Sequence, residues 1–543
     1  MKNQRSHYSA FYLLGFSFLV SACSSLAPVT RDTPGRDDAI PADSARLVEV
    51  VLDGSNEALL ATLPPLNREF RGVWVATVDN IDWPSEPGLS TADQQAEMLA
   101  ILDRVKELKL NAIIFQVRPT ADAFYLSEFE PWSAYLTGTQ GKPPDPYYDP
   151  LSFTIQEAHD RAIEVHAWVN PFRAYHPSAE AIFDSSHVSQ RSFTVEYGTQ
   201  LWMDPGNPDA RAHSLKVIMD IVDRYDVDGI HMDDYFYPYP VQDDSGATVP
   251  FPDEQSWQVY NATDGSISKD DWRRQNVDDF IKSVYDGVKE RKPWVKFGIS
   301  PFGIWRPGFP EGIVGFDAYD SLYADSRKWL VEGWVDYFSP QLYWAMESEG
   351  QPYPKLLDWW IEQNEKKRHI WPGIFTSRIR LEGSRYWGAE ELLSQIEYTR
   401  ATPGAEGNIH FSMVALMPAD YRMGEKLGLE SYTGTAIVPA SPWLNGTAPG
   451  KPVVQVMESS AGKEARIFDM MNSGVWLWVV RTLIGNSWQV EIVSGSQRRV
   501  QLPSGDRARG ARAVAISAID RTGLEGPISI VQFRESSTER RAW

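Results

Sequence analysis

Residues 207–234 read NPDARAHSLKVIMDIVDRYDVDGIHMDD and join a helix to the strand that follows it. Asn207 is a good helix N-cap, and Pro208 suits the first helical position because its missing N–H would have no partner there. Apolar residues recur at helical spacing over 215–222, and the β-rich run Gly229–Asp234 comes next. This order predicts a helix that packs on a sheet and leads into a buried strand.

The same alternation repeats along most of the chain. The β-rich runs are Gly72–Val78, Ala112–Arg118, Val165–Asn170, Gly229–Asp234, Phe297–Phe302, Tyr337–Tyr343, Ile370–Phe375 and Ile409–Val414. Eight strand–helix alternations over roughly 360 residues favour a (β/α)8 TIM-type barrel over an open doubly wound sheet. No Gly-rich phosphate loop follows the first run, which weakens the dinucleotide-binding alternative.

Composition excludes several classes of protein. The chain has 543 residues, too many for one ordinary domain, and its formal net charge of −21 lacks the basic footprint that a nucleic-acid partner needs. Its single cysteine excludes a disulfide scaffold and a cysteine-based zinc site. The nine histidines form no HExxH motif and no GxSxG elbow is present, so we expect neither a catalytic metal, nor another cofactor, nor a serine hydrolase.

The N-terminus predicts a lipoprotein. Lys2 and Arg5 precede an apolar run over 10–20, which is the layout of a secretory signal and is short for a membrane span. The run ends in Val20-Ser21-Ala22-Cys23, which resembles a bacterial lipobox with Cys23 as the lipidated residue. We therefore expect a signal peptide over 1–22, and Ser24 favours anchoring in the outer membrane, facing the periplasm.

Three further segments complete the predicted organisation. Residues 23–66 are rich in Ser, Pro and Asp at first and predict a tether, although 47–52 could pair as a strand. The barrel is expected over 67–435. Residues 440–543 contain some seven short alternating runs, which predict a fibronectin-type-III-like β-sandwich that serves as a spacer or binds glycan.

The two-residue period of a strand sorts the side chains of the predicted barrel. The second, third, fourth, sixth and eighth runs each set apolar residues against polar ones. The polar sets are Gln116 and Arg118; His166, Trp168 and Asn170; His231 and Asp233; Ser339, Gln341 and Tyr343; and His410 and Ser412. Because an unpaired buried polar group costs about 1–3 kcal/mol, we expect these faces to line a wet mouth at the C-terminal ends of the strands.

Aspartates near those strand ends are the candidates for catalysis, because paired carboxylates can divide acid and base roles at a glycosidic bond. Parity points Asp233 inward, and Asp234 joins it only through a bulge or turn at the strand end. Asp204 and Asp325 are further candidates. Asp204 could equally organise a turn before the helix, and Asp325 could equally cap one.

Polar and aromatic side chains around these acids are candidates for substrate binding. They are Arg118, Trp168, Asn170, Arg173, His231, Tyr235, Trp305, Gln341, Tyr343 and Trp344, with Phe236, Tyr237, Tyr239 and Trp132 as further stacking candidates. Arg118 and Arg173 could instead neutralise buried acids.

Seven stretches resemble the bacterial glycosyl-hydrolase-like family ten. They are Arg68–Pro84 (REFRGVWVATVDNIDWP), Phe115–Pro119 (FQVRP), Pro131–Gly138 (PWSAYLTG), His166–Arg173 (HAWVNPFR), Asp228–Tyr237 (DGIHMDDYFY), Gly298–Arg306 (GISPFGIWR) and Asp336–Trp344 (DYFSPQLYW). The resemblance implies a barrel hydrolase of amino-sugar glycans, with division-site members that cleave peptidoglycan lacking stem peptides. A more distant likeness to hydrolases of poly-N-acetylglucosamine, which also carry an aspartate pair after strand four, extends the catalytic candidacy to Asp234.

The sequence therefore predicts a glycoside hydrolase anchored by lipid in the outer membrane, with peptidoglycan strands as substrate and division-site proteins as possible partners. One alternative is an envelope protein that binds glycan without turnover. Another is a hydrolase of a different polysaccharide, such as poly-N-acetylglucosamine.

Overall fold

A computed structural model describes residues 46–48, 55–263, 265–417, 422–460, 462–471, 474–503 and 510–533. The predicted signal peptide and Cys23 lie outside these ranges, and their assignment stays a prediction. No helix in the described ranges is both long and apolar enough to cross a membrane.

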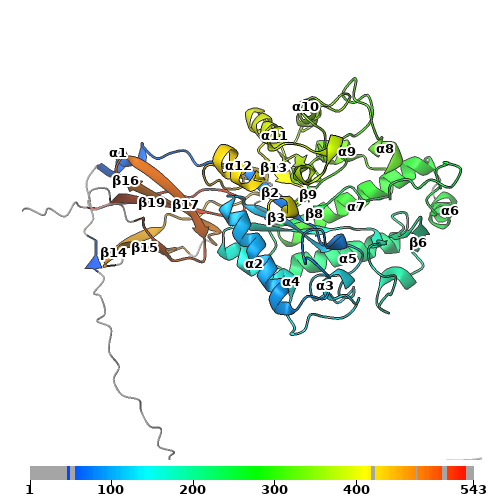
Figure 1. Cartoon of the computed structure of the whole chain (residues 1–543), viewed down its shortest axis with the longest axis horizontal. Helices are drawn as coiled ribbons and strands as arrows, with labels where there is room; N and C mark the ends of the chain where they lie inside the picture. Colours follow the sequence, from blue (N-terminus) through cyan, green and yellow to red (C-terminus); the bar gives the residue numbers. More distant parts are fainter. Residues whose placement is uncertain are drawn as a thin grey trace, which may run out of the picture. The chain divides into compact units, whose positions relative to one another are not determined.

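Parallel strands form the centre of the main domain (Figure 1). They are β2 (Phe70–Val75), β3 (Ala112–Arg118), β4 (Glu164–Val169), β8 (Gly229–Met232), β9 (Lys296–Ile299), β10 (Tyr337–Phe338), β11 (His369–Ile370), β12 (Gly373–Ile374) and β13 (Gly407–His410). The sheet order β11-β10-β9-β8-β4-β3-β2-β13-β12 begins and ends with two halves of one strand, split at Pro372. Trp371 N–H donates to Phe338 O on one side and Ile409 N–H donates to Pro372 O on the other, so this strand closes the sheet into a ring.

Helices follow each strand, which confirms the predicted α/β class and fits a TIM-type barrel. The longer ones are α2 (Thr91–Glu107), α4 (Pro150–Asp160), α5 (Pro208–Arg224), α6 (Glu254–Thr263), α7 (Lys269–Arg291), α9 (Ser326–Glu332), α10 (Tyr353–Glu362) and α11 (Ala389–Ala401). Shorter ones are α1 (Ser55–Leu60), α3 (Ala134–Thr137), α8 (Ala318–Ser321) and α12 (Met423–Lys426). The predicted cap of α5 is present, since the Asn207 side chain accepts from Asp209 N–H.

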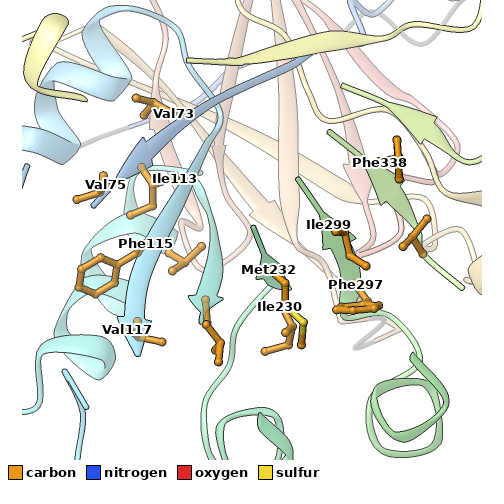
Figure 2. Close-up of a cluster of buried hydrophobic side chains, with 14 of the residues drawn as sticks. Val73, Val75, Ile113, Phe115, Val117, Ile230, Met232, Phe297, Ile299 and Phe338 are labelled. Carbon is orange, nitrogen blue, oxygen red and sulfur yellow. The ribbon is translucent and has the colours of Figure 1, made fainter. Parts of the chain in front are cut away.

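Apolar side chains fill the layer between the strands and the helices. Figure 2 labels ten of them along β2, β3, β8, β9 and β10, including Ile113, Phe115, Ile230 and Met232. Parity predicted six of these, those on β3, β8 and β10, to lie beneath the helices. The other strand face therefore points into the ring, as expected.

Aromatic side chains fill the interior of the ring toward the N-terminal ends of the strands. Phe70 stacks on Trp371 with centroids 3.7 Å apart, and Tyr337 stacks on Trp371 at 4.8 Å. Gly298 makes room for Tyr337, because a Cβ there would lie 2.0 Å from its ring. The predicted solvated mouth is therefore limited to the layer at the C-terminal ends of the strands. His166, which parity had placed in that mouth, is instead buried among these rings.

Strand eight departs from the predicted parity. Ile409 packs in the ring interior with Phe70 and Trp371, and Phe411 packs against that cluster. His410 faces the other way, hydrogen bonded to Thr376 Oγ1 (2.8 Å) and to the Tyr432 hydroxyl (3.0 Å). The aromatic side chains in the ring interior pack against an apolar neighbour, so Ile409 turns inward and His410 turns outward, contrary to the predicted parity.

The C-terminal region contains two antiparallel sheets, ordered β1-β14-β15-β18 and β17-β16-β19-β20. Their strands are β1 (Arg46–Leu47), β14 (Val453–Ser459), β15 (Gly462–Phe468), β16 (Leu477–Ile484), β17 (Ser487–Ser494), β18 (Arg499–Gln501), β19 (Ala511–Ile519) and β20 (Ser529–Gln532). Residues of both sheets, such as Ile467 and Trp478, share one apolar cluster. The region is a β-sandwich. β1 and α1 lie within the segment predicted as a tether, and β1 pairs with β14.

Contacts join the sandwich to the segments that precede the barrel strands. The Arg521 guanidinium lies 3.0 Å from an Asp228 carboxylate oxygen just before β8, and Trp443 Nε1–H donates to Asp336 just before β10 (2.9 Å). Burial alone would raise the pKa of Asp228, but the charges of Arg521 and His159 hold that pKa below its usual range. The sandwich therefore contacts the end of the barrel opposite to the C-terminal strand ends.

Candidate active site

A pocket of about 270 Å³ opens at the C-terminal ends of the barrel strands. It is lined by Trp74, Ala76, Val78, Ile81, Gln116, Trp168, Arg173, Asp233, Asp234, Tyr235, Ser300, Gln341, Tyr343 and Phe411. We call it the active-site pocket. Polar and aromatic walls around a carboxylate pair at this end of a barrel are typical of a ligand site.

Asp233 and Asp234 both line the active-site pocket, and each is only 5% exposed. The regular strand β8 ends at Met232, so strict alternation of side chains no longer applies to the two residues that follow. This is the turn at the strand end that the sequence required for Asp234 to join Asp233.

Donors from two neighbouring residues hold the Asp233 carboxylate. Asn170 Nδ2 donates to both of its oxygens (2.9 and 2.7 Å), and Trp168 Nε1 donates to Oδ2 (3.2 Å). The amide orientation of Asn170 is fixed because its Oδ1 accepts from Gln116 Nε2 (2.7 Å) and Arg173 Nη2 (3.2 Å). The network therefore ends on Asp233 as the common acceptor.

The environment of the pair favours retention of a proton. Burial and then the charge of Asp234 raise the pKa of Asp233 to about 7. Burial also raises the pKa of Asp234, against the hydrogen bond that its Oδ2 accepts from the Tyr239 hydroxyl. Two adjacent buried carboxyl groups disfavour the doubly ionised state, so this environment favours a proton on the pair.

Arg173 lies beside the acid pair, with its guanidinium 5.0 Å from the centroid of the Tyr235 ring. Its Nε donates to Pro119 O (3.1 Å), and no ion pair binds it among the described residues. Gln341 Nε2 donates to Ser300 O (2.9 Å), and the Ser300 hydroxyl is buried without a hydrogen-bond partner. Arg173 and Ser300 are therefore placed to bind polar groups of a ligand.

Eight of the residues predicted from the sequence line the active-site pocket: Gln116, Trp168, Arg173, Asp233, Asp234, Tyr235, Gln341 and Tyr343. Asn170 lies directly behind Asp233. Sequence reasoning missed the contributions of Trp74, Ala76, Val78, Ile81, Ser300 and Phe411. Trp74 and Ser300 were detectable, since each lies in one of the quoted motifs at an inward strand position.

Arg118 does not line the active-site pocket, which corrects its assignment to substrate binding. It is fully buried and pairs with Glu130, with Nε 2.7 Å from Oε2. Burial would raise the pKa of Glu130, but Arg118 and the hydrogen bond from His213 lower that pKa to about 2. Arg118 thus neutralises a buried acid, the alternative that the sequence left open.

His231 also lies below the active-site pocket rather than in it. Its Nε2 accepts from Trp74 Nε1–H (3.2 Å), and its Nδ1 lies 2.9 Å from the Tyr337 hydroxyl. Because His231 is buried beside His166, its pKa is well below the usual value, and the ring is neutral. It supports the wall residue Trp74 and does not contact the pocket.

Asp204 and Asp325 have structural roles. Asp204 accepts from Gly206 N–H (2.8 Å) and from the Ser256 hydroxyl, in the turn before α5. Asp325 is the N-cap of α9 and accepts from Trp305 Nε1–H (3.1 Å). Neither aspartate lines the active-site pocket, and neither does Trp305.

The remaining aromatic candidates divide between packing and the pocket region. Phe236, Tyr237 and Trp132 are buried in the apolar layer. Tyr239 bonds Asp234, and Trp344 lines a neighbouring hollow. Among the described residues, no group of three or more His, Cys, Asp or Glu side chains is arranged to hold a metal ion.

A barrel with a buried carboxylate pair in an aromatic pocket at its C-terminal strand ends belongs structurally to the class of glycosidase-like barrels. The family model "Glycosyl hydrolase-like 10" matches residues 69–386. The chain belongs to this family, as its motifs indicated.

Relatives span most of the chain. Glycosyl hydrolase YngK of Bacillus subtilis is 41% identical over 414 residues, 74% of this chain and 80% of that protein. Glycosyl hydrolase DigH of Escherichia coli is 31% identical over 428 residues, 74% of this chain and 91% of that protein. Among solved structures, the PgaB (BpsB) glycoside hydrolase domain from Bordetella bronchiseptica matches at 15% identity and a TM-score of 0.43, over 68% of this chain and all of that one.

Proposed function

We propose that this protein is a glycoside hydrolase of the cell envelope that cleaves amino-sugar glycan strands, with peptidoglycan lacking stem peptides as its substrate. The observation that carries the proposal is the Asp233–Asp234 pair, buried in an open pocket with aromatic walls, where burial and the charge of Asp234 raise the pKa of Asp233 to about 7. Membership of the glycosyl hydrolase-like family supports it.

Asp233 is the proposed proton donor. Its proton passes to the glycosidic oxygen as the bond from that oxygen to the anomeric carbon breaks. Asp234 stays ionised and stabilises the positive charge that develops on the sugar ring. Water then adds its hydroxyl to the anomeric carbon and returns a proton to Asp233, so the net reaction is hydrolysis.

The pocket walls suit a sugar ring. Trp74, Trp168, Tyr343 and Phe411 present aromatic surface on several sides, while Arg173, Gln116 and Gln341 offer polar groups to hydroxyl or acetamido substituents. This mixture of apolar faces and a few directed polar groups is typical of pockets that orient a small ring.

We propose further that the protein is held in the outer membrane by a lipid on Cys23 and works in the periplasm, where division-site proteins are its candidate partners. The C-terminal region is proposed to be a fibronectin-type-III-like module that acts as a spacer. Support for the module comes from its seven strands β14–β20, split three and four between the two sheets.

The test is mass spectrometry of the products after the full chain is incubated with intact peptidoglycan, amidase-treated peptidoglycan and poly-N-acetylglucosamine. Release of short glycans from the amidase-treated sample, and much less from the other two, is the expected result. Cleavage of poly-N-acetylglucosamine alone would favour that alternative substrate. Binding without any product would favour the glycan-binding alternative.

A further inference from the structure

A second hollow, of about 570 Å³, lies at the same end of the barrel as the active-site pocket. We call it the side hollow. Its lining comes from the loops after β10 and β12 and from α11, and consists of Trp344, Ala345, Met346, Glu347, Ser348, Arg378, Trp387, Glu391 and Ser394. The function described above makes no use of it.

A short run of aromatic rings connects the two cavities. Tyr343 lines the active-site pocket and Trp344, the next residue, lines the side hollow. Phe375 packs on Tyr343 with centroids 5.0 Å apart, and the Arg378 guanidinium lies 5.5 Å from the Phe375 ring centroid. The active-site pocket and the side hollow are therefore neighbours, with Tyr343 and Phe375 packed between them.

Arg378 is a half-buried guanidinium without an anion. It lies over Trp387, 4.5 Å from the ring centroid, and its Nε is buried with no hydrogen-bond partner. The hydrogen bond from its Nη1 to Arg385 O is long (3.4 Å), and no carboxylate in the described ranges forms an ion pair with it. Burial and the charge of Arg385 lower its pKa. The fully buried Arg118, by contrast, has a carboxylate partner in Glu130.

The two glutamates of the side hollow do not fill this role. Glu391 accepts from Met346 N–H (2.7 Å) and from Gln395 Nε2 (3.0 Å). Glu347 is exposed. The fork of N–H groups on Arg378 is thus available to an incoming acceptor, and a planar guanidinium matches a carboxylate best.

We propose that the side hollow is a sugar subsite in which Arg378 binds the carboxylate of an acidic amino sugar, while Trp387 and Trp344 stack on its ring. The inference rests on the proposed function and deepens it by naming the residue that distinguishes carboxylated strands from neutral ones. It selects glycans that carry a carboxylate on every second sugar, as peptidoglycan strands do through their lactyl groups, over neutral strands of the same backbone.

The test compares one glycan with and without its carboxylates. Strands freed of stem peptides by amidase are used directly or after carbodiimide activation and borohydride reduction, which converts each carboxylate to an alcohol. The proteins are the wild-type full chain, Arg378→Gln, and Arg385→Gln as a matched control that removes the same charge from the same loop but outside the lining of the hollow.

The wild type and Arg385→Gln should have a kcat/KM about ten- to a hundredfold higher on the carboxylated strands, as expected for one charge-assisted hydrogen-bonded contact. Arg378→Gln should lose that preference and cleave the two glycans equally. If the wild type cleaves the carboxylated and the reduced strands at equal rates, the subsite proposal is overturned and the proposed function stays intact. The same holds if Arg378→Gln loses activity equally on both glycans. If the wild type cleaves neither glycan, the proposed function fails. In that case calorimetry measures the affinities of the wild type and Arg378→Gln for the same two glycans. A preference of the wild type for the carboxylated glycan that Arg378→Gln loses supports the subsite, and equal affinities overturn it.

Discussion

The hydrogen bond from Trp168 to Asp233 provides a direct test of the proton donor. Trp168→Phe keeps an aromatic ring in the pocket wall but removes the indole N–H that lies 3.2 Å from Asp233 Oδ2. A donor stabilises the ionised carboxylate, so its loss must raise the pKa of Asp233. A hydrogen bond to a charged group contributes about 1.5–3 kcal/mol, and the 3.2 Å length places this one near the lower bound. Since one pKa unit corresponds to about 1.4 kcal/mol, the expected rise is about one unit, from about 7 to about 8.

The assay measures kcat/KM on glycan strands as a function of pH. The basic limb of this profile reports deprotonation of the acid in the free enzyme. Trp74→Phe is the matched control, because the Trp74 indole is also in the pocket wall and donates at the same 3.2 Å, but to His231. We expect the basic limb to move to higher pH in Trp168→Phe and to stay in place in Trp74→Phe. An unchanged or lowered limb in Trp168→Phe, or equal shifts in both variants, would refute the assignment of Asp233 as the acid.

Three further predictions concern charges around the site and the barrel. Asp234→Asn removes the like charge beside Asp233, so the basic limb should move to lower pH, opposite to the shift in Trp168→Phe; a shift to higher pH would contradict the paired-carboxylate account. Glu130→Gln leaves the buried Arg118 without its anion and should lower the free energy of unfolding in urea by about 3–5 kcal/mol, whereas Lys282→Ala, from an exposed pair, should cost less than about 1 kcal/mol. Arg521→Met should lower the free energy of unfolding most near neutral pH. Arg521 helps to hold the pKa of Asp228 below its usual range, and the stability that this lowered pKa contributes is present above the ordinary aspartate pKa and is lost as pH falls. A loss of stability relative to the wild type that grows in acid would contradict this sign.

Strand positions and the inward direction of Asp233 could be predicted because they depend on local periodicity. The eight runs and the apolar layer beneath the helices follow from the two-residue strand period, and the structure agrees with them on β3 and β8. The inward placement of Asp234 depended on where β8 ends, which pattern alone cannot fix.

Other features depended on packing between distant segments. The aromatic filling of the ring brings Phe70, Tyr337 and Trp371 together from three strands, and it turned Ile409 inward in place of His410. The roles of Asp204 and Asp325 were undecided in the sequence because a capping aspartate and a catalytic one have the same local pattern. Only the position of the active-site pocket distinguishes a capping aspartate from a catalytic one.

The most direct test of the central claim is the amount of glycan released from amidase-treated peptidoglycan by the wild type, Asp233→Asn and Asp325→Asn. Both substitutions replace one carboxylate oxygen with an amide, and Asp325→Asn retains an oxygen that can cap α9. The account predicts that Asp233→Asn releases almost no product while Asp325→Asn releases as much as the wild type. Full release by Asp233→Asn would contradict it.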